Sequence, residues 1–163
     1  MASDVADADQ EIPASDPLSI FRRNAILDTY RLSFMANSLV LPVYDAIKRD
    51  HGLNRGEYLL LFCLAHVPRL TAQQVAWLTG RPRNSISRAV HRMLAEGHLD
   101  RVPDPGDGRQ AILTLTNRGR RLHERILPLF EARERRLLGC LDPAERAQLD
   151  GLLGKLVAHT VSG

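Results

Sequence analysis

Residues 71–96 read TAQQVAWLTGRPRNSISRAVHRMLAE, and they contain two helical patterns separated at Gly80. Thr71 is followed three residues later by Gln74, which is the pattern of a capping box at the start of the first helix. Pro82 suits the first turn of the second helix, because proline there loses no hydrogen bond. A helix, a glycine-containing turn and a second helix together predict a helix-turn-helix.

The second helix, expected over about residues 82–96, has one apolar face and one polar face. The apolar residues fall at helical spacing and predict a face packed on the core: Ile86, Ala89, Val90, Met93 and Leu94. The side chains on the opposite face and its flanks are Arg83, Asn84, Ser85, Ser87, Arg88, His91 and Arg92. Arginine can pair with guanine, asparagine with adenine, and serine with phosphate, so we expect this face to contact DNA. The alternative is a solvated cationic face on an ordinary helix.

The segment of about residues 98–116 predicts a β-hairpin that forms a wing beside this helix. Two β-prone runs, HLDRV and AILTLT, flank the turn PDPGDGRQ. We expect Arg109 in the turn to enter a minor groove of DNA, where the negative potential attracts arginine. Asp107 could hold the Arg109 guanidinium in place. The alternative for these two residues is a surface ion pair of little energetic consequence.

The remaining segments predict further helices. Asp16-Pro17 starts a long helical pattern that runs to about Arg49, with a kink or interruption expected at Pro42. The apolar run YLLLFCLAHV predicts a central buried helix. Helix-capping residues precede this helix and two others near the end of the chain: Asn54, Thr116 and Asp142.

Charge is unevenly distributed along the 163 residues, whose formal net charge is +3. Residues 1–16 hold five acidic residues and no base, and we expect them to form a disordered acidic tail. Residues 81–125 hold ten arginines against five acidic residues, a balance that favours a polyanionic partner. We find no apolar stretch near the ~18–20 residues of a membrane span and no signal-peptide pattern, so we expect a soluble cytoplasmic protein without membrane contact.

The sequence gives no support for catalysis, a metal site or a cofactor. Cys63 and Cys140 have no metal-ligand or disulfide spacing, and the six histidines are dispersed. His123-Glu124 begins like a zinc-protease motif, but Leu127 occupies the place of the second histidine. No nucleophile elbow, phosphate-binding glycine loop or paired-carboxylate site is present, and we therefore expect a protein that is not an enzyme.

The stretch GHLDRVPDPGDGRQAILTLTNRG resembles the wing signature of the MarR (multiple antibiotic resistance regulator) family. The matching positions are Gly97, Asp107-Gly-Arg109 and Leu115-Thr116-Asn-Arg-Gly119. SISRAVHRM and LNRGEYLLLFCLA resemble the recognition helix and the second helix of that family. The resemblance covers about residues 18–160.

The resemblance implies a mainly α-helical fold with a small β-hairpin wing, in which a winged helix-turn-helix joins an interlocking helical dimerisation region. It places an N-terminal dimerisation helix at 17–52, the winged helix-turn-helix at 53–117 and C-terminal dimerisation helices at 118–163. The implied protein is a homodimeric transcriptional regulator that binds a pseudo-palindromic operator in double-stranded DNA, with half-sites ~34 Å apart. Apolar residues that a monomer could not easily cover also favour a dimer: Phe21, Phe34, Leu39, Leu149, Leu152, Leu153, Leu156 and Val157.

Members of the family are commonly repressors released by small aromatic ligands, often phenols or carboxylates. The candidate ligand-binding residues in this sequence are His51, Tyr58 and His66, with Arg22 or Arg31 as a partner for a carboxylate. A thiol sensor of the same fold is an alternative, with Cys140 more accessible than Cys63, which lies in an apolar run. A winged-helix module that binds an acidic protein is a second alternative.

Overall fold

The computed structural model describes residues 16–103, 106 and 110–162. The expected acidic tail, apart from Asp16, and the wing residues Asp107 and Arg109 lie outside the described residues. The chain divides into two compact units, Met1–Ser38 and Leu39–Gly163, and each is described by itself.

The first unit contains a short 3₁₀ helix, η1, over Pro17–Phe21, and the beginning of α1, which spans Leu27–His51. The expected single helix from residue 17 is therefore wrong, because the helix is interrupted before Leu27. Asn24 explains the break: its side chain donates to the carbonyl of Ile20 at 2.7 Å and accepts from the backbone N–H of Ile26 at 2.8 Å. Such local bonds compete with the helical backbone pattern. Helix α1 is not interrupted at Pro42, contrary to one of the expected outcomes.

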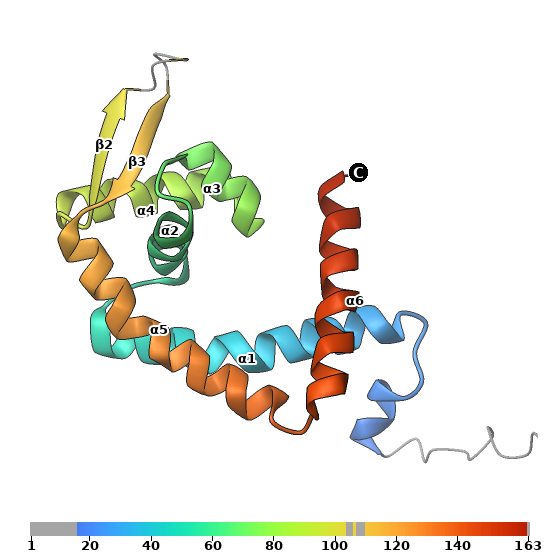
Figure 1. The fold of residues 1–163 in the computed structure, drawn as a ribbon. Helices are drawn as coiled ribbons and strands as arrows, with labels where there is room; N and C mark the ends of the chain where they lie inside the picture. Colours follow the sequence, from blue (N-terminus) through green and yellow to red (C-terminus); the bar gives the residue numbers. More distant parts are fainter. Residues whose placement is uncertain (1–15, 104–105, 107–109, 163) are drawn as a thin grey trace, which may run out of the picture. The chain divides into compact units, whose positions relative to one another are not determined.

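Among its described residues, the second unit contains five further helices and a three-stranded antiparallel sheet, in which β3 lies between β1 and β2. Figure 1 shows β2 and β3 side by side. The helices are α2 (Arg55–His66), α3 (Ala72–Thr79), α4 (Arg83–Ala95), α5 (Asn117–Leu138) and α6 (Pro143–Ser162). The strands are β1 (Leu70–Thr71), β2 (Leu99–Pro103) and β3 (Ala111–Leu115). The β2–β3 hairpin is the expected wing, with Leu99 opposite Leu115 and Pro103 opposite Ala111. The short strand β1 pairs with β3 and has no counterpart in the sequence-based prediction.

The helix starts follow the capping patterns of the sequence. Capping boxes join Asn54 to Glu57 and Thr71 to Gln74. The Thr116 hydroxyl accepts from the backbone N–H of Gly119 at 3.0 Å, at the start of α5. Each such cap satisfies backbone donors that the helix itself leaves unpaired.

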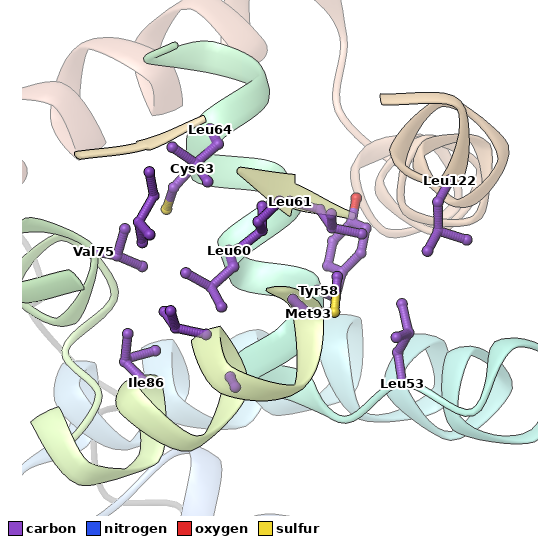
Figure 2. Packing of buried hydrophobic residues seen from close by; sticks show 14 of the residues in the cluster. Leu53, Tyr58, Leu60, Leu61, Cys63, Leu64, Val75, Ile86, Met93 and Leu122 are labelled. Atoms are coloured by element: carbon purple, nitrogen blue, oxygen red, sulfur yellow. The ribbon is translucent and has the colours of Figure 1, made fainter. Parts of the chain in front are cut away.

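Helix α2 forms the centre of the core (Figure 2). It packs on α3, α4, α5 and β3. Leu60, Leu61 and Leu64 have no exposed surface, which agrees with the expectation from its apolar sequence. Burying a leucine side chain stabilises a fold by roughly 1.5–3 kcal/mol, so α2 fixes the positions of the elements around it. Among the described residues, no helix is long and apolar enough to cross a membrane.

Candidate nucleic-acid interface

The polar side chains of α4 point away from the core, because the opposite face of the helix packs on it. Ile86, Ala89, Val90 and Met93 are buried. The side chains between them are exposed, and five of those expected to contact DNA lie on this surface: Arg83, Asn84, Ser87, Arg88 and His91. We call these five residues the outer face of α4.

The turn between α3 and α4 is fixed by backbone hydrogen bonds. Gly80 has a φ of +62°, in the left-handed region that favours glycine. The N–H of Arg81 donates to the carbonyl of Ala76 at 3.1 Å and so closes the end of α3. Pro82 is the N-cap of α4 and supplies no side-chain cap. The helix therefore begins at Arg83, one residue later than the sequence predicts. The first turn of α4 contains no acidic residue, so its positive dipole end faces solvent uncompensated.

Arg92, another residue expected to contact DNA, has its guanidinium bound within the protein. Nη1 donates to both carboxylate oxygens of Glu57 at 3.1 and 3.0 Å, and Nε donates to Glu96 at 2.8 Å. Nη2 donates to the carbonyl of Gly52 at 3.1 Å. Arg92 therefore ties α4 to the start of α2.

Ser85 also lies toward the protein rather than on the outer face of α4. It is half-buried, and a methyl group placed on Gly56 of α2 would come within 3.7 Å of its hydroxyl oxygen. Ser85 therefore lies at the α2–α4 contact, whereas Ser87 is exposed.

Two hollows flank the outer face of α4. One, of about 370 Å³, is bounded by α4 and the sheet and includes Ser87, His91 and Arg101. The other, of about 500 Å³, includes Arg83, Gln73 and Trp77. Sequence reasoning missed Arg101, although its place in β2, beside the expected recognition helix, was a usable signal.

A third hollow, of about 280 Å³, lies among α1, α2 and α5, and is lined by Leu39, Tyr44, Tyr58, Leu59, Phe62, Leu127, Phe130, Glu131 and Glu134. We call it the aromatic cavity. Of the five residues expected to bind a ligand, only Tyr58 lines it. His66 is exposed against the Phe62 ring, with centroids 4.4 Å apart, and His51 lies at the end of α1. Arg22 and Arg31 belong to the first unit, where Arg31 Nε donates to the carbonyl of Phe21 at 2.9 Å.

Tyr58 is one of the polar residues that line this cavity. Its side chain is 2 % exposed, and its hydroxyl has no hydrogen-bond partner among the described residues. Burial raises the pKa of Tyr58, so the phenol stays neutral. Its ring stacks on Phe130 at 4.9 Å and on His123 at 5.9 Å. His123 is buried, its Nδ1 also has no partner in the described part of the chain, and burial lowers its pKa.

The two cysteines differ in their surroundings. Burial raises the pKa of the Cys63 thiol, which lowers its reactivity. Cys140 is exposed, with Sγ 3.7 Å from the carbonyl oxygen of Leu137. Within the described ranges, no group of three or more His, Cys, Asp or Glu side chains is arranged to hold a metal ion.

Comparisons with known proteins give a consistent assignment. A model of the MarR family matches residues 51–110. The HTH-type transcriptional regulator BilQ of Clostridium symbiosum is 29% identical over 108 residues, which are 66% of this chain and 75% of BilQ. The crystal structure of wild-type MarR from E. coli superposes with a TM-score of 0.64 at 22% identity, covering 82% of this chain and 98% of that one.

A second solved structure, Bordetella bronchiseptica BpsR, superposes with a TM-score of 0.61 at 24% identity, and the match covers 78% of this chain and 98% of BpsR. The segment matched by the family model holds α2, α3, α4 and β2, which are the elements that form the helix-turn-helix and the start of its wing. This segment of the chain is therefore similar to the MarR family, and the chain shares the fold of the solved E. coli MarR structure.

Proposed function

We propose that this protein is a sequence-specific repressor that inserts α4 into the major groove of double-stranded DNA. The observation that carries the proposal is the outer face of α4, where Arg83, Asn84, Ser87, Arg88 and His91 are exposed. Arg88 lies near the middle of this face, and arginine can donate two hydrogen bonds to guanine. We therefore assign base contact to Arg88 and, at the start of the helix, to Asn84.

Phosphate contacts would hold the helix in register. The uncapped start of α4, with no acidic residue in its first turn, suits a phosphate group, because the free backbone N–H groups and the dipole both favour an anion. Arg101 borders the hollow beside Ser87 and His91, and so supplies a further cation between α4 and the wing. Contacts of this kind position the protein but carry no sequence information.

A homodimer would place two copies of α4 on one operator. Helix α6 supports this proposal, since it has no buried residue and carries exposed apolar side chains: Leu152, Leu153, Leu156, Val157 and Val161. Such a surface marks an interface between proteins. A two-fold dimer reads a pseudo-palindrome whose half-sites are ~34 Å apart.

We assign release of the repressor to a small aromatic ligand in the aromatic cavity. Apolar cavities with a few polar groups are the usual sites for small molecules, and the unpaired hydroxyl of Tyr58 could bond to a phenol. DNA binding by the similar protein BpsR is regulated by 6-hydroxynicotinic acid. A ligand that binds the DNA-incompetent dimer more tightly would weaken operator binding by a coupling of ~1–3 kcal/mol.

Selection from a random pool of DNA duplexes tests the proposal directly. We expect the full chain to enrich a pseudo-palindrome, and Arg88→Ala to weaken its binding by ~1–3 kcal/mol and to lose base preference at one position per half-site. Arg136→Ala is the matched control, because Arg136 is exposed on α5, away from α4. A pool that stays unenriched, or an Arg88→Ala variant that binds like the control, would contradict the proposed function. A protein that binds acidic polypeptides instead would show no preference among duplexes.

A further inference from the structure

The polar groups around the aromatic cavity are acidic. Glu131 and Glu134 line it, one helical turn apart on α5, and none of the described residues in its lining is basic. Each carboxylate forms an ion pair at 3.9 Å, Glu131 with Arg135 and Glu134 with Arg146. Both glutamates are exposed, so these long pairs leave them available to another cation.

The walls of the cavity are aromatic. The ring of Phe130 is 4.9 Å from that of Tyr58 and 5.6 Å from that of Tyr44, between centroids, and Phe62 is 6.4 Å from Tyr58. Aromatic faces carry negative potential and attract organic cations. The same cluster already holds a cation outside the cavity, since the guanidinium carbon of Arg55 lies 5.1 Å from the Tyr44 ring centroid.

From these observations we infer that the ligand of the aromatic cavity is a lipophilic organic cation, an aromatic amine or quaternary ammonium compound. The aromatic walls take its apolar part, Glu131 and Glu134 neutralise its charge, and the Tyr58 hydroxyl accepts from an ammonium N–H where one is present. A carboxylate ligand would meet two like charges in the lining. This inference rests on the proposed regulation by a ligand and changes the charge class expected from the sequence.

Isothermal titration calorimetry of the full chain with three related probes tests the inference. The probes are benzyltrimethylammonium, neutral benzyl alcohol and the anion phenylacetate. We expect the cation to bind at least about tenfold more tightly than phenylacetate, a difference of about 1.4 kcal/mol. Benzyl alcohol should bind with intermediate affinity.

Variants locate the site. Glu131→Gln combined with Glu134→Gln should weaken cation binding by roughly tenfold and leave benzyl alcohol unaffected, while Phe130→Leu should weaken cation binding through the lost ring face. Glu124→Gln is the control, an exposed glutamate of α5 outside the cavity lining. Phenylacetate binding as tightly as the cation, or no binding by any probe, would overturn the inference, and so would glutamine variants that bind the cation normally.

The DNA experiment separates this inference from the proposed function. Operator binding is measured first without a probe, so its absence there is a failure of the proposed function alone. With operator binding established, benzyltrimethylammonium should lower operator affinity, and the combined Glu131→Gln and Glu134→Gln variant should resist the effect. If phenylacetate lowers operator affinity instead, regulation by a ligand stands and the cation assignment is wrong.

Discussion

Gly119 lies where the start of α5 passes the backbone carbonyl of His98. A Cβ atom at this position would come within 2.1 Å of that carbonyl oxygen, a distance that no relaxed structure allows. Backbone atoms cannot move aside as a flexible side chain can, so the close approach requires glycine. This contact explains in physical terms why the Leu115-Thr116-Asn-Arg-Gly119 pattern ends in glycine.

Gly119→Ala should therefore destabilise the fold by about 1–3 kcal/mol, the range for overpacking a well-packed site. Gly151→Ala is the matched control: Gly151 is also helical, nothing lies within 4 Å of its added Cβ, and alanine should stabilise α6 by up to ~1 kcal/mol. Urea denaturation at pH 7.5 measures both changes. Equal stability of the two variants would show that α5 can shift away from His98 at little cost.

His123 makes the stability of the protein depend on pH. Burial, and then the nearby His66, lower the pKa of His123 below its ordinary value, so the folded state binds a proton less readily than the unfolded chain. The free energy of unfolding is thus complete above the unfolded pKa of ~6.5 and falls as the pH drops below it. His98, whose pKa burial also lowers, acts in the same direction.

His123→Phe keeps an aromatic ring beside Tyr58 and removes the titrating group. We expect the wild-type protein to lose stability to urea between pH 7.5 and pH 5.5, and the variant to lose less, with His98 accounting for the remainder. His98→Phe in the same series assigns that remainder. If His123→Phe loses as much stability as the wild type on acidification, the pKa of His123 is the same in the folded and unfolded states.

At the scale of elements, the contact between α2 and α4 depends on a buried carboxylate. Glu57 is 2 % exposed and serves two purposes: it completes the capping box with Asn54 and accepts from Arg92 on α4. A charged carboxylate in this position needs both partners, because an unpaired buried charge is strongly unfavourable. The pair therefore couples the start of α2 to the orientation of α4.

Arg92→Ala should destabilise the fold by about 1–3 kcal/mol, because it leaves Glu57 with fewer donors. Arg88 lies one turn earlier on the outer face of α4, and Arg88→Ala should change the free energy of unfolding by less than ~0.5 kcal/mol. The same two variants should rank in the opposite order in operator binding by folded protein. An Arg92→Ala variant with unchanged stability would restore Arg92 as a candidate for DNA contact.

The sequence predicts well those elements that local chemistry determines. Thr71, Asn54 and Thr116 stand where their side chains can reach a backbone N–H within the next turn, and the spacing of Ile86, Val90 and Met93 fixes the buried face of α4. Other features depend on contacts distant in sequence. Strand β1 exists only through pairing with β3, more than forty residues away, and Arg92 finds Glu57 thirty-five residues earlier. Neither distance leaves a pattern in a single sequence.

The break before α1 and the aromatic cavity show two other limits of prediction from the sequence. The Asn24 side chain bonds to the backbone of Ile20 and Ile26, and the helix does not continue there. The helical and the side-chain-bonded conformations of this segment compete closely, so the sequence pattern does not decide between them. The cavity combines residues of α1, α2 and α5, and its acidic lining is visible only once these helices are packed. Of the residues that line the cavity, only Tyr58 is a candidate ligand-binding residue in the sequence analysis, because it is a polar residue in an apolar helix.

At the scale of the whole molecule, α6 indicates an assembly larger than one chain. Helix α6 is twenty residues long and has no buried residue. Its apolar side chains Leu152, Leu156 and Val157 are 62%, 53% and 61% exposed. A short isolated helix is marginal in water, and most helices owe their stability to an apolar face that packs on other elements. In the proposed homodimer, a second copy of the chain would cover this surface with the symmetry that a pseudo-palindromic operator requires.

Leu152→Glu combined with Leu156→Glu should separate the dimer, because it places two carboxylates on that surface. Sedimentation equilibrium should give twice 18.2 kDa for the wild type and 18.2 kDa for this variant. The combination of Gln148→Glu and Lys155→Gln changes the net charge equally without removing a leucine, and this variant should stay dimeric.

The monomeric variant should protect a single half-site of the operator. Five base pairs inserted between the half-sites should abolish dimer binding, because this insertion turns one site by about half a helical turn. A wild-type monomer that nevertheless protects both half-sites with full affinity would show that DNA, rather than α6, brings the two copies together.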